Sequence, residues 1–395
     1  QNNQIMIYDK NYKKIVRNKK IIDQKNFNLE KGNFRHYMRK EIFEQPSVFT
    51  YSINQFLRLD KNNDYLSFPL KKIYLKKIDK IFLIACGTAN IACLLGKSWM
   101  NSFLNIPIEV DYGSEFRYRN PKIKKNDLCI FVSQSGETAD TLASLKYSKK
   151  FTNNIISIVN NEESSIARES TFCLPIKAGP EIGVASTKAF TCQLAILFLL
   201  SLHISKLKNH INTKEIDIFL DDLEKIPSVM VEILNLEKKL IKISKLISLK
   251  KSVLFVGRGL CHPLSLEGAL KLKEVSYIHA EGYAAGELKH GPIALVDENI
   301  PIIFLIPFDD KVSKIISNLE EVKARGGKII VIADTRVESY LPEGIWKSFF
   351  IPSFKSIFSP FLFSIPVQLI AYHTAVQKGT DVDQPRNLAK SVTVE

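Results

Sequence analysis

A hydroxyl-rich turn, Ser133 to Thr138, follows directly after a short apolar run, Leu128 to Val132. We expect a buried strand, then this turn, then a helix that starts near Gly136. The free N–H groups of a helix's first turn favour an anion, and Gly136 lets the backbone approach a ligand closely. The turn therefore fits a phosphate monoester, but a simple Ser/Thr helix cap fits it equally well. A dinucleotide is disfavoured because the G-x-G-x-x-G pattern is absent from the turn.

A second group of reactive side chains lies in residues 266–292, where ionisable residues alternate with small ones. Lys271 and Glu274 are three positions apart and share one helix face, either as a surface ion pair or as an acid/base pair. The helix runs into a Gly- and Ala-rich loop, where backbone can approach a ligand. His290 stands in a rigid turn before Gly291. It is either structural or an acid/base group near neutral pH.

The elements that position these groups follow an α/β pattern that begins at Asp79. Apolar strands are expected at 81–85, 106–110, 128–132, 155–159 and 171–175, with helices between them. Such alternation predicts a doubly wound, flavodoxin-like parallel sheet with helices on both faces and ligand loops at the carboxyl ends of its strands.

The pattern restarts at Ser252. Residues 253–259, 301–306 and 328–334 repeat residues 81–87, 128–132 and 154–160, each about 170 to 175 residues later, which predicts a tandem repeat of one domain. Only the first copy keeps the hydroxyl-rich turn. The second has Pro-Phe-Asp-Asp at 307–310, which would repel a phosphate, so one site per pair of domains is expected.

Composition excludes several other classes of protein. The 395 residues carry a net charge of +14, but the lysines are scattered and no nucleic-acid motif accompanies them. Six cysteines without a C-x-x-C motif indicate buried free thiols in a reduced, cytoplasmic protein. The apolar run 189–204 is short and interrupted by polar residues, so we expect a buried helix rather than a membrane span. No signal peptide is recognisable.

Five segments together resemble the glutamine–fructose-6-phosphate aminotransferase family: residues 86–92, 132–141, 181–194, 266–292 and 383–395. The resemblance is to the isomerase part of that family, which is built from two sugar isomerase (SIS) domains, and it covers about residues 32 to 395. It implies that residues 1–31 are a remnant of a glutaminase domain, 32–78 a linker with leading helices, and 380–395 a catalytic tail. The two SIS domains are then 79–210 and 251–379, joined by a helical connector hairpin at 211–250. Within the first segment, 5–9 and 13–17 are expected to form a hairpin.

The resemblance also implies roles for individual residues. Those expected to hold the sugar phosphate are Thr88, Ser133, Gln134, Ser135 and Thr138, and those expected to contact the sugar are Val184 and Ser186. Glu274 matches the base that moves a proton between C1 and C2, with Lys271 beside it to position the substrate. His290 matches a ring-opening residue donated by the other subunit of a homodimer. Lys390 matches the lysine that forms a Schiff base with the ketose. No metal or cofactor is expected.

The resemblance therefore implies conversion of fructose 6-phosphate to glucosamine 6-phosphate, with ammonia derived from glutamine by a glutaminase domain that this chain lacks. Position 89 is Ala where the family commonly has Ser, so one hydroxyl contact is expected to be missing. Two alternatives remain open: another tandem phosphosugar isomerase or deaminase not coupled to glutamine, and a non-catalytic phosphosugar-binding regulator. A glutaminase domain in the upstream reading frame would favour the aminotransferase over the isomerase or deaminase that is not coupled to glutamine.

Overall fold

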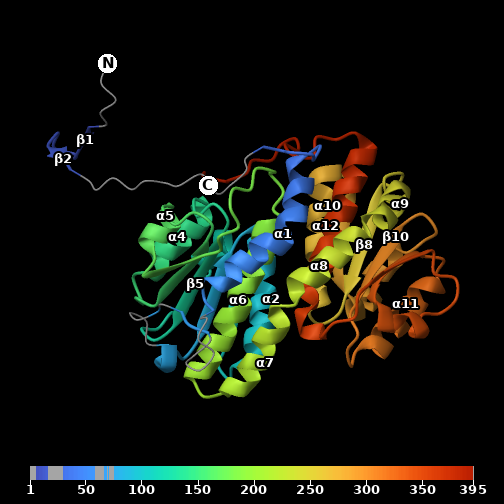
Figure 1. Ribbon diagram of the computed structural model, residues 1–395, viewed down its shortest axis with the longest axis horizontal. Coiled ribbons are helices and arrows are strands. Elements are labelled where there is room, and N and C mark those ends of the chain that lie inside the picture. The colour runs from blue at the N-terminus through green and yellow to red at the C-terminus, as the bar shows by residue number, and fades with distance from the viewer. Residues whose placement is uncertain (1–5, 17–29, 58–65, 69, 71–74, 395) are drawn as a thin grey trace.

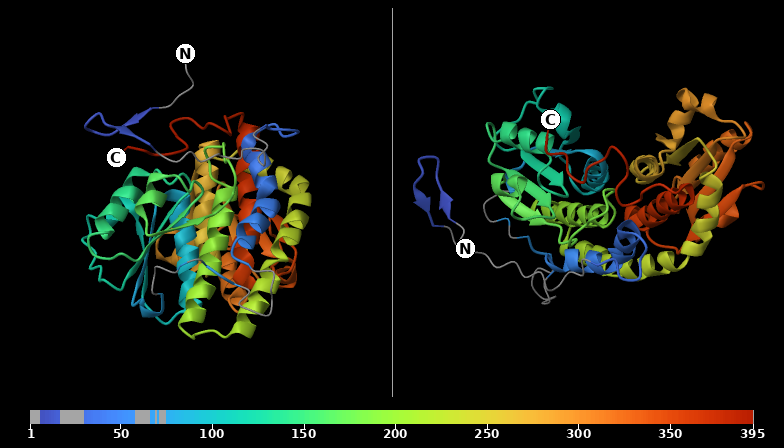
Figure 2. Two further views of the ribbon diagram at one scale, coloured as in Figure 1. Left: turned by 60° about the vertical axis from the view of Figure 1, so that its left-hand side comes forward. Right: turned by 90° about the horizontal axis from the view of Figure 1, so that it is seen from above.

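The computed structural model describes residues 6–16, 30–57, 66–68, 70 and 75–394. Two α/β domains lie on either side of a layer of helices, and a small N-terminal hairpin stands apart from both (Figure 1). In the view from above in Figure 2, the two sheets lie on opposite sides of the central helices.

The first sheet has five parallel strands in the order β4-β3-β5-β6-β7. These are β3 (Ile81–Ala85), β4 (Ile108–Tyr112), β5 (Leu128–Ser133), β6 (Ile155–Val159) and β7 (Phe172–Pro175). The strand expected at 106–110 begins two residues later, because Pro107 has no N–H to donate to the sheet. Strands β3, β5 and β6 are buried along their whole length, as their uninterrupted apolar sequences predict.

The second sheet repeats this topology. Its order is β12-β11-β10-β8-β9, again with all five strands parallel. The strands are β8 (Ser252–Gly257), β9 (His279–Ala284), β10 (Pro301–Ile306), β11 (Lys328–Asp334) and β12 (Lys347–Ile351). Numbered within each domain, both orders are 2-1-3-4-5, the flavodoxin-like arrangement, which confirms the predicted tandem repeat.

The Gly- and Ala-rich segment after Glu274 differs from the expectation of a loop. Residues 279–284 form the edge strand β9, paired with β8. Gly282 makes this possible, because a Cβ there would lie 2.6 Å from the backbone of Ser265 and Leu266. The absence of a side chain lets the strand pack directly on the neighbouring helix.

The remaining elements are helices. They are α1 (Tyr37–Asn54), α2 (Gly87–Phe103), α3 (Gly113–Phe116), α4 (Ala139–Ser148), α5 (Ser165–Glu169), α6 (Lys188–Leu207), α7 (Thr213–Leu223), α8 (Ile226–Asn235), α9 (Glu237–Ile247), α10 (Cys261–Ser276), α11 (Val312–Lys323) and α12 (Ser359–Lys378), with short 3-10 turns η1 (Leu75–Lys77), η2 (Ala285–His290), η3 (Pro292–Leu295), η4 (Thr335–Tyr340) and η5 (Ser356–Phe358).

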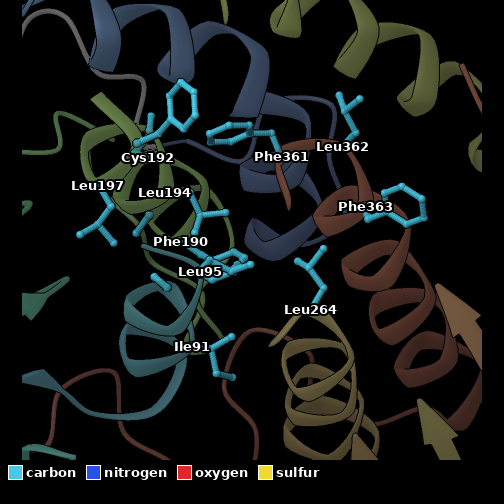
Figure 3. Packing of buried hydrophobic residues seen from close by; sticks show 14 of the residues in the cluster. Ile91, Leu95, Phe190, Cys192, Leu194, Leu197, Leu264, Phe361, Leu362 and Phe363 are labelled. Atoms are coloured by element: carbon cyan, nitrogen blue, oxygen red, sulfur yellow. The ribbon is translucent and has the colours of Figure 1, made fainter. Parts of the chain in front are cut away.

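Helices α2, α6, α10 and α12 build a continuous apolar core between the domains. Figure 3 shows their side chains converging there, with Leu95, Phe190, Leu264 and Phe361 among those labelled. Segments Lys188–Leu207 and Ser356–Lys378 are long and apolar enough to cross a membrane, but 83% and 94% of their apolar windows are buried inside the protein. The predicted buried helix at 189–204 is thus confirmed as a core helix. All six cysteines are free thiols, four of them buried and Cys86 and Cys173 partly so.

The connector differs from the predicted hairpin, because residues 211–250 contain three helices, α7, α8 and α9. Asn212 starts α7 with a capping box that includes Glu215, and Pro227 lies in the first turn of α8. These local start points divide the segment into three.

Helix α1 is a leading helix within the segment 32–78, as expected. At the N-terminus, β1 (Ile7–Tyr8) pairs antiparallel with β2 (Lys14–Ile15), as the hairpin prediction required. The outer ends of that hairpin, much of the segment 1–31 and several residues of the linker lie outside the described residues.

Candidate active site

A cavity of about 250 Å³ lies at the carboxyl edge of the first sheet. Six segments line it: the start of α2 with the residue before it, the end of β5 with the turn after it, residues 184–186, helix α6, helix α10 and the C-terminal tail. The lining residues are Cys86, Thr88, Ala89, Val132, Ser133, Gln134, Ser135, Thr138, Val184, Ser186, Gln193, Lys271, Glu274, Leu388, Ala389, Lys390 and Val392. Every predicted site residue except His290 is therefore brought to one cavity.

The hydroxyl-rich turn is ordered by its own side chains. Ser133 Oγ lies 3.0 Å from Thr138 Oγ1 and accepts the Gly136 N–H at 3.1 Å. Helix α4 begins at Ala139, three residues later than predicted, with Thr138 as its N-cap. The prediction placed the helix start too early because these hydroxyl contacts keep residues 133–138 in a turn.

Gly136 is required at its position in the turn. Its φ is +69°, and a Cβ there would lie 2.0 Å from Ser164 Oγ. Only glycine satisfies both constraints. The turn consequently closes against the loop that precedes α5, and its hydroxyls remain at the cavity wall.

Helix α10 presents three ionisable residues on one face. Lys271, 1% exposed, lies between Glu274, whose Oε2 is 2.5 Å from Lys271 Nζ, and Glu267, whose Oε1 is 3.7 Å from it. Glu267 is fully buried, and this burial raises its pKa to about 8. Burial alone would lower the pKa of Lys271, but the carboxyls of Glu274 and Glu267 reverse this and raise it. Lys271 is thus held as an ammonium against Glu274.

The C-terminal tail turns Lys390 inward. Its ammonium donates to Glu181 Oε2 at 2.7 Å and to the Gly183 carbonyl at 2.6 Å, with a quarter of the side chain exposed. Burial would raise the pKa of Glu181, but the charge and hydrogen bond of Lys390 lower it overall, so Glu181 is ionised. The tail continues to Val392, whose carbonyl accepts the N–H of Ala139 at the start of α4.

His290 lies elsewhere. It ends η2 in the second domain, is exposed, and is followed by Gly291 with a φ of +130°. It does not line the cavity of its own chain. This placement is compatible with donation to another copy, but it does not test that prediction.

Three contributors to the site were missed from the sequence. Glu267 could have been found, because positions 267, 271 and 274 recur on one helix face. Glu181 lies within the segment 181–194, but nothing local pairs it with Lys390. Gln193 of α6 is 1% exposed and lines the cavity, and its side-chain oxygen has no hydrogen-bond partner among the described residues.

Comparison with known proteins agrees with the geometry. The SIS domain family matches residues 74–202 and 246–378, the two α/β units described above. The chain belongs to the SIS-domain family. Within it, this SIS chain is 48% identical over 99% of its length to the glutamine–fructose-6-phosphate aminotransferase of Rhizobium meliloti, and 50% identical over 92% of its length to that of Bartonella henselae. It spans only 64% and 60% of those two proteins, so its similarity is to a part of each.

Solved structures of SIS proteins extend the comparison. The C-terminal domain of glucosamine-fructose-6-phosphate aminotransferase from Francisella tularensis superposes with a TM-score of 0.86 at 43% identity, covering 90% of this chain and all of that one. A glucosamine-6-phosphate deaminase from Thermotoga maritima has a TM-score of 0.70 at 24% identity and shares the fold. The expected tandem SIS architecture is confirmed, as is the resemblance to the isomerase part of the aminotransferases.

Proposed function

We propose that this chain is the sugar-converting part of a glutamine–fructose-6-phosphate aminotransferase, which turns fructose 6-phosphate into glucosamine 6-phosphate. The observation that carries the proposal is that a hydroxyl-rich turn, a carboxylate and a lysine line one cavity. Relatives named as aminotransferases across nearly the whole chain support it. The ammonia comes from glutamine, hydrolysed by a part of the protein outside this sequence.

In this proposal the hydroxyls of Ser133, Ser135 and Thr138 hold the phosphate group, together with Thr88 and Gln134. Val184 and Ser186 contact the sugar chain. Holding the phosphate at the strand ends fixes the position of C1 and C2 relative to α10 and the tail. His290 of a second subunit opens the hexose ring by acid/base catalysis.

The chemistry then passes through an imine. The amine of Lys390 attacks the C2 carbonyl of the open ketose, and the carbonyl oxygen leaves as water. Ammonia displaces the lysine from C2 and leaves a ketimine. Glu274 removes a proton from C1 and delivers one to C2, while the C1 hydroxyl loses its proton and the nitrogen gains one, which yields the 2-amino aldose. Lys271 holds Glu274 in place through their short ion pair.

The alternative is a tandem SIS isomerase or deaminase that acts without a glutaminase partner. The fold alone permits it, because the deaminase from Thermotoga maritima shares that fold. The aminotransferase is favoured because similarity at 48% and 50% identity runs through both domains and the tail.

The test uses the purified chain with fructose 6-phosphate. We expect glucose 6-phosphate to form without ammonia, glucosamine 6-phosphate to form with ammonium salts, and borohydride to trap the ketose covalently on Lys390. Lys390→Arg should abolish trapping, whereas Lys378→Arg, an exposed lysine at the end of α12, should not. Trapping that persists in Lys390→Arg, or no conversion of the sugar at all, contradicts the proposal.

A further inference from the structure

Glu41, on helix α1, is a buried carboxyl group to which the reaction scheme assigns no role. It is 2% exposed, and its Oε1 accepts the backbone N–H groups of Ile182 at 2.5 Å and Gly183 at 3.2 Å. Its Oε2 is buried without a hydrogen-bond partner among the described residues. Burying an ionised carboxyl group with one oxygen unpaired costs folding free energy, so such a group either carries a proton or is kept for a functional role.

The backbone that Glu41 holds is the one that receives Lys390. Gly183 donates its N–H to Glu41 and accepts the Lys390 ammonium on its carbonyl, while Glu181 accepts the same ammonium. The contact is close, since a Cβ on Gly183 would lie 3.0 Å from Glu41 Oε2. Glu41 therefore forms a hydrogen bond with the same residue, Gly183, whose carbonyl accepts the lysine.

The C-terminal tail also forms hydrogen bonds with the start of α1. Asp383 accepts the N–H groups of Tyr37 and Met38, both at 2.9 Å, and its carbonyl accepts the N–H of Val184. Figure 1 shows the red C-terminal segment passing close to the start of α1, and the left view of Figure 2 agrees. The 181–184 segment is thus fastened to both α1 and the tail.

The charges around Glu41 favour its neutral form. Burial raises its pKa to about 8, and the nearby Glu181 carboxylate adds to this, while Lys390 and the two N–H groups act in the opposite direction. Asp383 of the C-terminal tail contacts the start of α1. One turn beyond Glu41, Glu44 forms an ion pair with Lys188 at 2.8 Å. Two neighbouring buried carboxyls cannot both ionise without repulsion, so one proton resides on Glu41.

We propose that Glu41 is a positioning residue for Lys390: as a neutral carboxylic acid it holds the 182–183 backbone so that Gly183 and Glu181 aim the lysine amine into the cavity. The inference rests on the imine role proposed for Lys390. Ionisation of Glu41 sets a second negative charge against Glu181 and displaces the segment. Misplacement of an attacking group by about 1 Å can cost about 100-fold in rate.

The experiment measures the rate of borohydride trapping of fructose 6-phosphate in the whole chain, by intact mass, between pH 7 and 9.5. Glu41→Ala should slow trapping about 10- to 100-fold at pH 7. Glu41→Gln keeps an oxygen acceptor and is always neutral, so it should trap at nearly the wild-type rate at pH 7. Glu44→Gln, the same change one turn along α1, is the matched control.

The decisive measurement is the ratio of wild-type to Glu41→Gln trapping rates, in which pH effects common to both chains cancel. This ratio should fall between about pH 7 and pH 9, with the midpoint of the fall near pH 8, whereas the ratio for Glu44→Gln should stay flat. A ratio for Glu41→Gln that does not change across pH 8, or full trapping by Glu41→Ala, overturns the positioning role. Absence of trapping in the wild-type chain would instead contradict the proposed function, so the two failures are distinct.

Discussion

Thr88 donates a hydrogen bond of 3.4 Å to Glu267, although the two residues are 179 positions apart. Thr88 is in the first turn of α2 in the first domain, and Glu267 is on α10 of the second. The bond joins the side of the cavity that is proposed to hold the phosphate to the helix that carries Lys271 and Glu274. The site is therefore a product of both domains, and changes on α10 should affect both binding and stability.

Glu267→Gln should alter how stability depends on pH. The folded-state pKa of Glu267, about 8, is above its ordinary value of 4.5, so between these values unfolding releases a proton. Stability supplied by the protonated group is thus lost as pH rises toward 8. Relative to wild type, Glu267→Gln should gain roughly 3 kcal/mol in free energy of unfolding between pH 5 and pH 8.

The measurement is urea denaturation at both pH values. Glu320→Gln, at an exposed position on α11, is the control and should track wild type. If the free energy of unfolding of wild type and of Glu267→Gln changed equally between the two pH values, Glu267 would be ionised in the folded protein.

Gly136→Ala should impair both folding and substrate binding. Alanine at φ +69° is strained, and its Cβ would collide with Ser164. We expect a loss of more than about 2 kcal/mol of stability, from strain and overpacking together. Gly326→Ala is matched in φ, at +80°, but has open space around it, so it should cost about 1 kcal/mol. Thermal unfolding measures the stability of both variants, and an equal loss of stability in Gly136→Ala and Gly326→Ala would refute the steric argument.

Thr138→Val should weaken substrate binding. The change keeps the side-chain volume and removes the hydroxyl that lies 3.0 Å from Ser133 Oγ at the cavity wall. Loss of one hydrogen bond to a charged group is worth about 1.5–3 kcal/mol, which raises KM for fructose 6-phosphate roughly 10- to 100-fold. Thr50→Val, an exposed position on α1, is the control. An unchanged KM would remove Thr138 from the phosphate site.

His290→Ala and Glu274→Gln should complement each other. If His290 acts across a dimer, each variant alone is inactive, but a mixed dimer contains one site with both native residues. Co-refolding or co-expression of the two variants should restore part of the isomerase activity. Lys390→Arg is then mixed with His290→Ala and, separately, with Glu274→Gln. Recovery of activity with His290→Ala but not with Glu274→Gln would indicate that Lys390 acts from the same chain as Glu274. No recovery in any mixture would exclude donation of His290 between subunits.

Much of the fold was predictable because it depends on local pattern. Strands such as Ile81–Ala85 and Ile155–Val159 are buried on both faces, so their apolar runs are visible in the sequence. The repeat offset predicted the tandem domains. The errors occurred where a local contact decided the structure: hydroxyl bonds delayed the start of α4, and Gly282 allowed an edge strand where a loop was expected.

By itself, the sequence determined which chemical groups are present and which strand ends and helix faces carry them, because 2.0 and 3.6 residue periods are local properties. Only the tertiary structure decided that Lys390 meets Glu181 and Gly183, that Glu41 supports them from the linker helix, and that Thr88 reaches Glu267. Those contacts join segments far apart in the chain. The raised pKa values of Glu41 and Glu267 arise from burial, which exists only once the two domains close around a common core.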